Sequence, residues 1–175
     1  GSDLEYYTVN YLGETYIPLL DKEDVSLRLK ARLGYGDGFG DSSGLPFLKN
    51  FFAGGIRSVR GYAYNSLGAD NTLYETSTAG VFETAGGNVL LTGTAALQFP
   101  LPGVKETDQA RLSLFTDVGQ IYNDNIEVDE LRYSAGLALA WMTPIGPLSF
   151  TYAAALNSES RDETEGFQFS IGSTF

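Results

Sequence analysis

The sequence has neither cysteine nor histidine among its 175 residues. The usual transition-metal ligands, the serine–histidine triads and the cysteine nucleophiles are therefore missing. The aspartates Asp37, Asp41 and Asp70 lack the spacing of a calcium-binding loop and are interpreted as solvated carboxylates. These absences predict a protein that is not an enzyme and has no cofactor and no metal site.

Basic side chains are also scarce. Eleven lysines and arginines stand against 22 aspartates and glutamates, which gives a formal net charge of −11. Proteins that bind nucleic acid need basic surfaces that displace counterions from the phosphates. The charge balance therefore argues against a nucleic-acid partner, and it is typical of solvated acidic loops.

Long hydrophobic runs are the third absence. No apolar stretch reaches the roughly 18 residues that identify a transmembrane helix. The mean hydropathy of −0.09 is in the range of soluble proteins. A transmembrane β-barrel has a similar value, because its lipid-facing and lumen-facing residues alternate along each strand. Composition thus excludes membrane helices and leaves a membrane barrel open.

Alternation of apolar and polar residues is the dominant pattern that is present. In one segment Leu27, Leu29 and Leu33 alternate with the basic residues Arg28, Lys30 and Arg32, which we interpret as polar lining of a barrel interior. The alternation predicts about seven strands, each of about 9–12 residues, the length that spans a bilayer when tilted. The segments are 7–17, 25–34, 89–99, 111–119, 131–141, 148–154 and 167–175.

The connections between these segments alternate in length. Residues 18–24, 100–109 and 143–147 are short or anchored by proline, whereas 36–87, 123–130 and 157–165 are longer or strongly polar. Short turns at one end and long loops at the other are typical of outer-membrane barrels. Aromatic residues near strand ends fit two interfacial girdles: Phe99, Trp141 and Phe175 at the short turns, and Tyr35, Tyr122 and Tyr133 at the loops. The pattern favours an all-β transmembrane antiparallel up-and-down barrel over a soluble β-sandwich.

An odd number of strands is unusual for such a barrel. Bacterial single-chain barrels normally have an even number, and seven strands leave two unpaired edges that lipid does not tolerate. We therefore expect residues 1–175 to be the C-terminal part of a larger barrel, with further strands before Gly1. Alone, this part is expected either to pair its edges with another copy or to collapse into a distorted small barrel.

The connection 36–87 contains the motif that identifies a family. Val59-Arg60-Gly61-Tyr62 matches a VRGF/Y signature and is flanked by GYGDGFG (34–40) and PFLKNFFAGG (46–55). LFTDVG (114–119), AGLALAWMTPIGPLSFTYA (135–153) and FQFSIGSTF (167–175) follow in the same order as in the family. The chain resembles, over essentially its whole length, the outer-membrane superfamily of the BamA and TamA assembly factors and the two-partner secretion translocators. The BamA branch fits best, and its periplasmic POTRA domains are not part of these residues.

The resemblance implies that the long loop folds back into the barrel and is locked there. The motif arginine, Arg60, would contact inward acidic residues, and Asp117 is the matching one. Alternation independently assigns Asp117 to the inner face. The family's second acidic position corresponds to Gln98, which brings no charge, so that Glu83 of the loop is an alternative partner.

The last segment has two interpretations. Its alternating residues Phe167, Phe169 and Ile171 and its terminal Phe175 resemble the signal by which outer-membrane barrels are recognised, but also fit an ordinary last strand. Gly172 matches the glycine at which the family's last strand kinks beside a lateral seam.

The resemblance implies assembly and insertion of β-barrel proteins into the Gram-negative outer membrane, by strand templating at that seam. Its partners would be outer-membrane lipids, unfolded barrel clients and accessory lipoproteins. The alternatives are a translocator of the two-partner secretion type, a TamA-like factor and a passive structural barrel.

Overall fold

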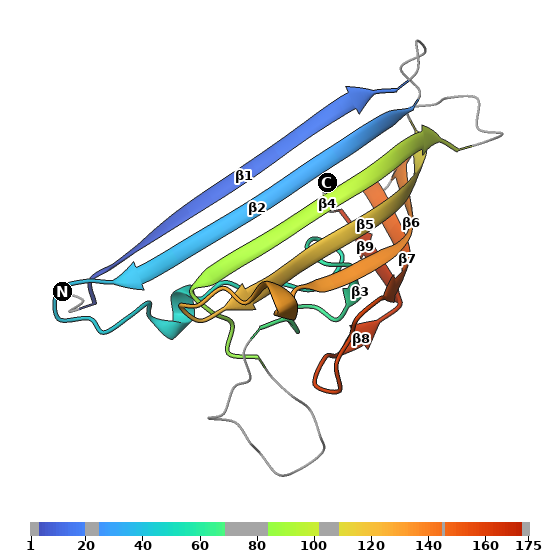
Figure 1. The fold of residues 1–175 in the computed structure, drawn as a ribbon. Coiled ribbons are helices and arrows are strands. Elements are labelled where there is room, and N and C mark those ends of the chain that lie inside the picture. Colours follow the sequence, from blue (N-terminus) through green and yellow to red (C-terminus); the bar gives the residue numbers. More distant parts are fainter. Residues whose placement is uncertain (1–3, 20–24, 69–83, 102–108, 145, 173–175) are drawn as a thin grey trace.

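The computed structural model describes residues 4–19, 25–68, 84–101, 109–144 and 146–172. They form one seven-stranded antiparallel sheet in the order β1-β2-β4-β5-β6-β7-β9 (Figure 1). Within this sheet each strand pairs with the sheet strand that follows it in the chain, so the up-and-down topology and the all-β class are confirmed. The strands are β1 (Tyr6–Pro18), β2 (Ser26–Gly38), β4 (Val89–Pro100), β5 (Ala110–Tyr122), β6 (Arg132–Thr143), β7 (Gly146–Ala155) and β9 (Phe167–Ile171).

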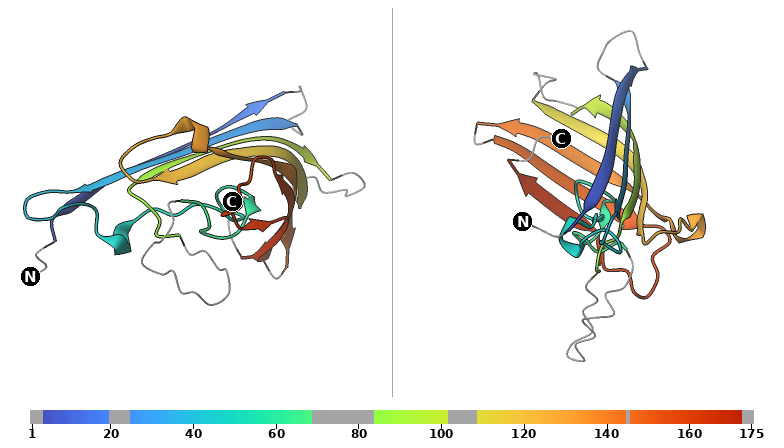
Figure 2. Two further views of the ribbon diagram at one scale, coloured as in Figure 1. Left: turned by 60° about the horizontal axis from the view of Figure 1, so that its bottom comes forward. Right: turned by 90° about the vertical axis from the view of Figure 1, so that its left-hand side faces the viewer.

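The sheet is curved but does not close, and β1 and β9 are its two edge strands. Figure 2 shows the curvature, with the long connection between β2 and β4 on the concave side. Within that connection β3 (Gly61–Tyr62) pairs with β8 (Thr164–Glu165), which directly precedes β9. The concave side therefore corresponds to the lumen of a barrel.

Helical structure is limited to two short 3-10 turns among the described residues, η1 (Phe47–Lys49) and η3 (Val128–Glu130). No helix in the described part of the chain is long and apolar enough to cross a membrane.

Burial in the strands is inverted relative to a soluble protein. Large apolar side chains lie on the outside, for example Tyr152, which is 70% exposed, and Phe169, which is 63% exposed. Polar side chains are buried on the concave face, including Asp117, Ser134 and Thr151. Apolar residues outside and polar residues inside are the arrangement that a lipid environment requires of a barrel wall.

Three expectations need correction. β2 continues to Gly38, where Gly36 and Asp37 still pair with β1, so the long connection covers 39–88 rather than 36–87. Tyr122 is buried and its hydroxyl donates to the carbonyl of Glu127, because the loop after β5 folds over it. It is therefore not part of an interfacial girdle. The last strand ends at Ile171, and Phe175 lies outside the described residues.

Candidate functional site

The connection between β2 and β4 forms a small apolar core of its own against the sheet. Phe51, Val59 and Leu67 are buried there together with Leu90 of β4 and Ile121 of β5. Isolated bridges join Phe51 to Gly87 and Ala53 to Leu67. Because these contacts pack apolar loop residues against apolar side chains of β4 and β5, the loop is held as a folded unit on the concave face.

Arg60 attaches this loop to β5. Its Nε donates to Oδ2 of Asp117 at 2.7 Å and its Nη2 donates to Oδ1 at 2.8 Å. The backbone N–H of Arg60 donates to the same carboxylate at 3.1 Å. Asp117 is 0% exposed, so the pair is shielded from water. A two-pronged contact between guanidinium and carboxylate is the strong form of a charged hydrogen bond.

Phe115 completes the surroundings of Arg60, although the alternation pattern did not single it out. The Cζ atom of Arg60 lies 3.3 Å from the centre of the Phe115 ring. Phe115 is buried, two residues before Asp117, and so points to the same inner face of β5. The spacing is visible in the sequence, but an aromatic residue on a polar face departs from the pattern that defines the strand.

The second proposed partner of Arg60 is placed differently. Gln98 of β4 and Arg60 line the same cavity, but no hydrogen bond joins them. Within the described residues, Asp117 is the carboxylate with which Arg60 forms an ion pair. Glu83 lies outside the described residues. In the part of the chain that is described, no group of three or more acidic side chains is arranged to hold a metal ion.

Gly61 and Tyr62 connect the motif to β6, to β7 and to the loop that follows β7. Gly61 has a φ of 90°, and a Cβ atom there would lie 3.2 Å from that of Ala153 on β7. Only glycine adopts such a backbone readily. Tyr62 is fully buried, and its hydroxyl lies 3.3 Å from the carbonyl of Tyr133 and 3.4 Å from Oδ1 of Asn157. Burial raises the pKa of Tyr62 to about 12.

A second buried arginine lies near Tyr62 and was not expected from the sequence to be a site residue. Arg132 begins β6, is 1% exposed, and donates from Nε to Asp162 at 2.5 Å. Its Nη2 lies 3.1 Å from Glu159 but outside hydrogen-bonding geometry. Arg132 thus ties the loop 156–163 to the sheet. The sequence does contain a signal for this ion pair: an arginine on the polar face at the end of a strand, followed by an acidic loop.

The last strand is linked to the motif through Gln168. Its Nε2 donates to the backbone carbonyl of Tyr62 at 2.8 Å. Phe167, Phe169 and Ile171 alternate with Gln168 and are exposed on the outer side. Gly172 has a φ of 74° immediately after the strand, so the backbone turns there. The loop motif and β9 therefore share a direct contact, which Gln168 makes.

Comparisons with known proteins agree with this geometry. The Omp85 superfamily domain matches residues 1–175. The outer membrane protein assembly factor BamA of Neisseria meningitidis is 35% identical over all of this chain and 24% of its own length. BamA of Neorickettsia risticii is 27% identical, with 100% and 23% covered, and a SAM50-like protein of Schizosaccharomyces pombe is 24% identical, with 99% and 36% covered.

A solved structure has the same fold. BamA of Haemophilus ducreyi lacking POTRA domains 1–3 superposes with a TM-score of 0.87 at 33% identity, covering 100% of this chain and 36% of that one. The chain thus spans about a quarter of the length of the two BamA relatives. The match over every residue, the fold and the inverted burial together lead to one conclusion: this chain belongs to the Omp85 superfamily of outer-membrane β-barrel proteins.

Proposed function

We propose that the protein assembles and inserts other β-barrel proteins into the outer membrane, without acting as an enzyme. The relatives that carry the names of assembly factors support this proposal. The observation that carries it is the last strand. β9 is an edge strand of the described sheet, and β7 is the strand with which it pairs.

An edge strand has one free side, whose backbone N–H and C=O groups can pair with another strand. In lipid such groups are costly when unpaired. A client strand that adds to this edge satisfies them, in the manner of β-strand addition to a sheet. The outward residues Phe167, Phe169 and Ile171 keep the edge at the lipid surface. Strand templating at a lateral seam is therefore the mechanism of the proposal.

The loop lock has a defined part in this mechanism. Arg60 fixes the motif to Asp117 of β5, and Gln168 connects the motif to β9. A β9 that moves outward must break the contact between Gln168 and Tyr62. The loop thereby limits how far the seam opens while the sheet stays intact.

The partners of the proposal follow from its chemistry. Unfolded outer-membrane proteins are the clients, and outer-membrane lipids contact the apolar outer face. Accessory lipoproteins of the assembly complex are further proposed partners. We also propose that residues 1–175 are the C-terminal part of a larger barrel, whose other strands pair with β1. Without those strands, edge-to-edge association of two copies is the expected outcome.

Complementation tests the function directly. These residues replace the matching part of a full-length BamA in cells depleted of their own BamA. We expect growth and normal amounts of folded outer-membrane barrels, measured by heat-modified mobility on gels. The control is the same graft carrying a covalent cross-link between β9 and its barrel neighbour, which prevents opening. Growth of the cross-linked graft at the uncrosslinked rate contradicts templating at the seam.

The translocator alternative predicts a different result. A channel for polypeptide must conduct ions when its loop is displaced. Deleting residues 50–68 in the full-length protein would then produce a large, steady conductance in planar bilayers. Conductance together with failed complementation would favour translocation over assembly.

A further inference from the structure

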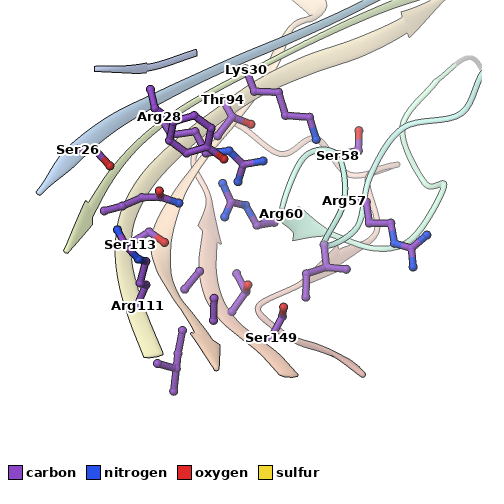
Figure 3. A pocket seen from close by; sticks show the side chains of 17 residues that line it. Ser26, Arg28, Lys30, Arg57, Ser58, Arg60, Thr94, Arg111, Ser113 and Ser149 are labelled. Atoms are coloured by element: carbon purple, nitrogen blue, oxygen red, sulfur yellow. The ribbon is translucent and has the colours of Figure 1, made fainter. Parts of the chain in front are cut away.

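A cavity of about 430 Å³ lies between the motif loop and the strands. It is bounded by the strand ends near the short turns, among them Ser26 of β2, Gln98 of β4 and Ser149 of β7. The loop residues Ile56, Arg57, Ser58 and Arg60 close it on the other side (Figure 3). The cavity is therefore on the concave face, beside the ion pair of Arg60 and Asp117, and it extends beyond that pair.

The charged side chains that line this cavity are all basic. Arg28, Lys30, Arg57, Arg60 and Arg111 contribute, although the whole chain carries a net charge of −11. Arg60 is paired with Asp117 and Arg28 with Glu14 at 2.8 Å, and Arg111 also has an interaction partner. Neither carboxylate lines the cavity. The cavity thus has an excess of positive charge.

Three of the cations converge. In Figure 3 the head groups of Arg28, Lys30 and Arg60 point toward one another, whereas Arg57 points away. Glu14, which is opposite Lys30 in the register of β1 and β2, attracts its ammonium, whereas Arg28, Arg32 and Arg60 repel it. Among the described residues Lys30 makes no hydrogen bond or ion pair of its own. An anion beside Lys30 would relieve this repulsion.

Hydroxyl groups also line the cavity. Ser149 is 3% exposed, and its Oγ has no hydrogen-bond partner within the described residues. Ser113 and Thr151, also buried, line the same wall. A buried hydroxyl without a partner is unfavourable and marks a place where a polar atom fits. Basic side chains and buried hydroxyls therefore line one cavity, which fits a ligand that carries both an anionic group and hydroxyl groups.

We propose that this cavity binds a phosphorylated polyol. The phosphate lies beside Lys30 and Arg28, because guanidinium and ammonium groups are the preferred phosphate ligands of proteins. The hydroxyl-bearing body extends toward Ser113 and Ser149. Such a ligand occurs as a free phosphorylated polyol or as a lipid headgroup. Binding at this cavity is independent of the assembly function, because the cavity and its charges exist whether or not the seam opens.

Titration calorimetry on the natural full-length protein in detergent tests the free form. Glycerol 3-phosphate is the probe, and inorganic phosphate is the comparison. We expect glycerol 3-phosphate to bind more tightly, with affinity that falls as salt is added. Equal affinities for the two would remove the polyol part of the proposal. No heat from either, together with no lipid bound in the next experiment, overturns it.

Native mass spectrometry tests the lipid form. The full-length protein is released from nanodiscs of phosphatidylcholine with and without phosphatidylglycerol. Retained phosphatidylglycerol that glycerol 3-phosphate displaces would identify the lipid headgroup as the occupant. If phosphatidylglycerol is retained but glycerol 3-phosphate does not displace it, the lipid binds on the outer face. If, in addition, glycerol 3-phosphate does not bind in the calorimetry experiment, the cavity site is contradicted.

Two variants assign binding to the cavity. Lys30→Gln should weaken glycerol 3-phosphate binding about tenfold, in line with loss of one charged contact. Ser149→Ala should weaken it a few-fold without lowering the melting temperature of the ligand-free protein, because no internal partner is lost. Lys49→Gln is the matched control, since Lys49 lies in η1 outside the cavity. Wild-type affinity in both cavity variants contradicts the proposed site.

Discussion

Arg60 packs against Phe115 as well as against its carboxylate partner, with Cζ 3.3 Å from the ring centre. The guanidinium is flat, so one face contacts the ring while its edge donates two hydrogen bonds to Asp117. A lysine ammonium has no flat face and no fork. The site is therefore built for arginine rather than for positive charge alone.

The first prediction concerns this pair. In the full-length protein, Arg60→Ala should weaken attachment of the loop by about 3–5 kcal/mol, because it leaves a buried carboxylate unpaired. Arg60→Lys should not restore it, and Asp117→Asn should be milder because an amide oxygen still accepts one bond. Limited proteolysis within residues 50–68 and a double-mutant cycle measure the effect. A coupling energy near zero would show that the two residues do not act as one lock.

The second prediction separates the ring from the charge. Phe115→Leu should weaken the attachment of the loop by about 0.5–2 kcal/mol, because leucine keeps an apolar contact with Arg60 but cannot make the cation–π contact. Phe150→Leu is the matched control, because Phe150 is on the outer face of the sheet, away from Arg60. If both variants leave proteolysis of the loop unchanged, the ring contributes packing only.

The third prediction concerns Arg132 and Asp162. Asp162→Asn should expose the loop 156–163 to protease by weakening a pair that is almost completely buried. It should increase cleavage near Arg60 less than Arg60→Ala does, because Arg60 keeps its pair with Asp117, although Tyr62 and Ala63 contact the loop 156–163. Arg161→Gln is the control. The longer, partly exposed contacts of Arg161 with Glu130 and Glu159 are worth at most about 1 kcal/mol. Equal cleavage in both variants would contradict a special role for Arg132.

The fourth prediction is a pH dependence. Burial raises the pKa of Tyr62 to about 12, above the value of 10.0 in an unfolded chain. The folded state therefore holds this proton more tightly, so its contribution to stability is complete below pH 10 and is lost as pH rises toward 12. Tyr62→Phe should remove this part of the alkaline loss. The difference in tyrosinate absorbance between wild type and variant measures it, and a difference titrating near pH 10 would contradict burial of the hydroxyl.

The fifth prediction concerns orientation. Asn125 and Gln109 are exposed at opposite ends of β5, beside a long loop and a short turn. If the long loops are extracellular, a cysteine at Asn125 reacts with an impermeant thiol reagent on intact cells and one at Gln109 reacts only after lysis. The opposite result would invert the orientation.

The strands could be predicted because their physics is local. Alternation along β5 is enough to assign Asp117 to the inner face, since neighbouring side chains of a strand point to opposite sides. The same rule failed for Tyr122, because the parity of a residue does not show which loop will cover it. Arg132 and Asp162 are 30 residues apart, and no local pattern joins them. The path of the loop likewise depends on contacts with strands that follow it in the chain.

That dependence has a consequence for the time course of folding. The contacts that hold the motif span 57 residues from Arg60 to Asp117, 95 from Tyr62 to Asn157 and 106 from Tyr62 to Gln168. Closing such long intervals costs chain entropy that is recovered only when the distant strands are in place. The loop is synthesised before its docking surface exists. Its attachment must therefore be a late event, completed only after β9 has been synthesised.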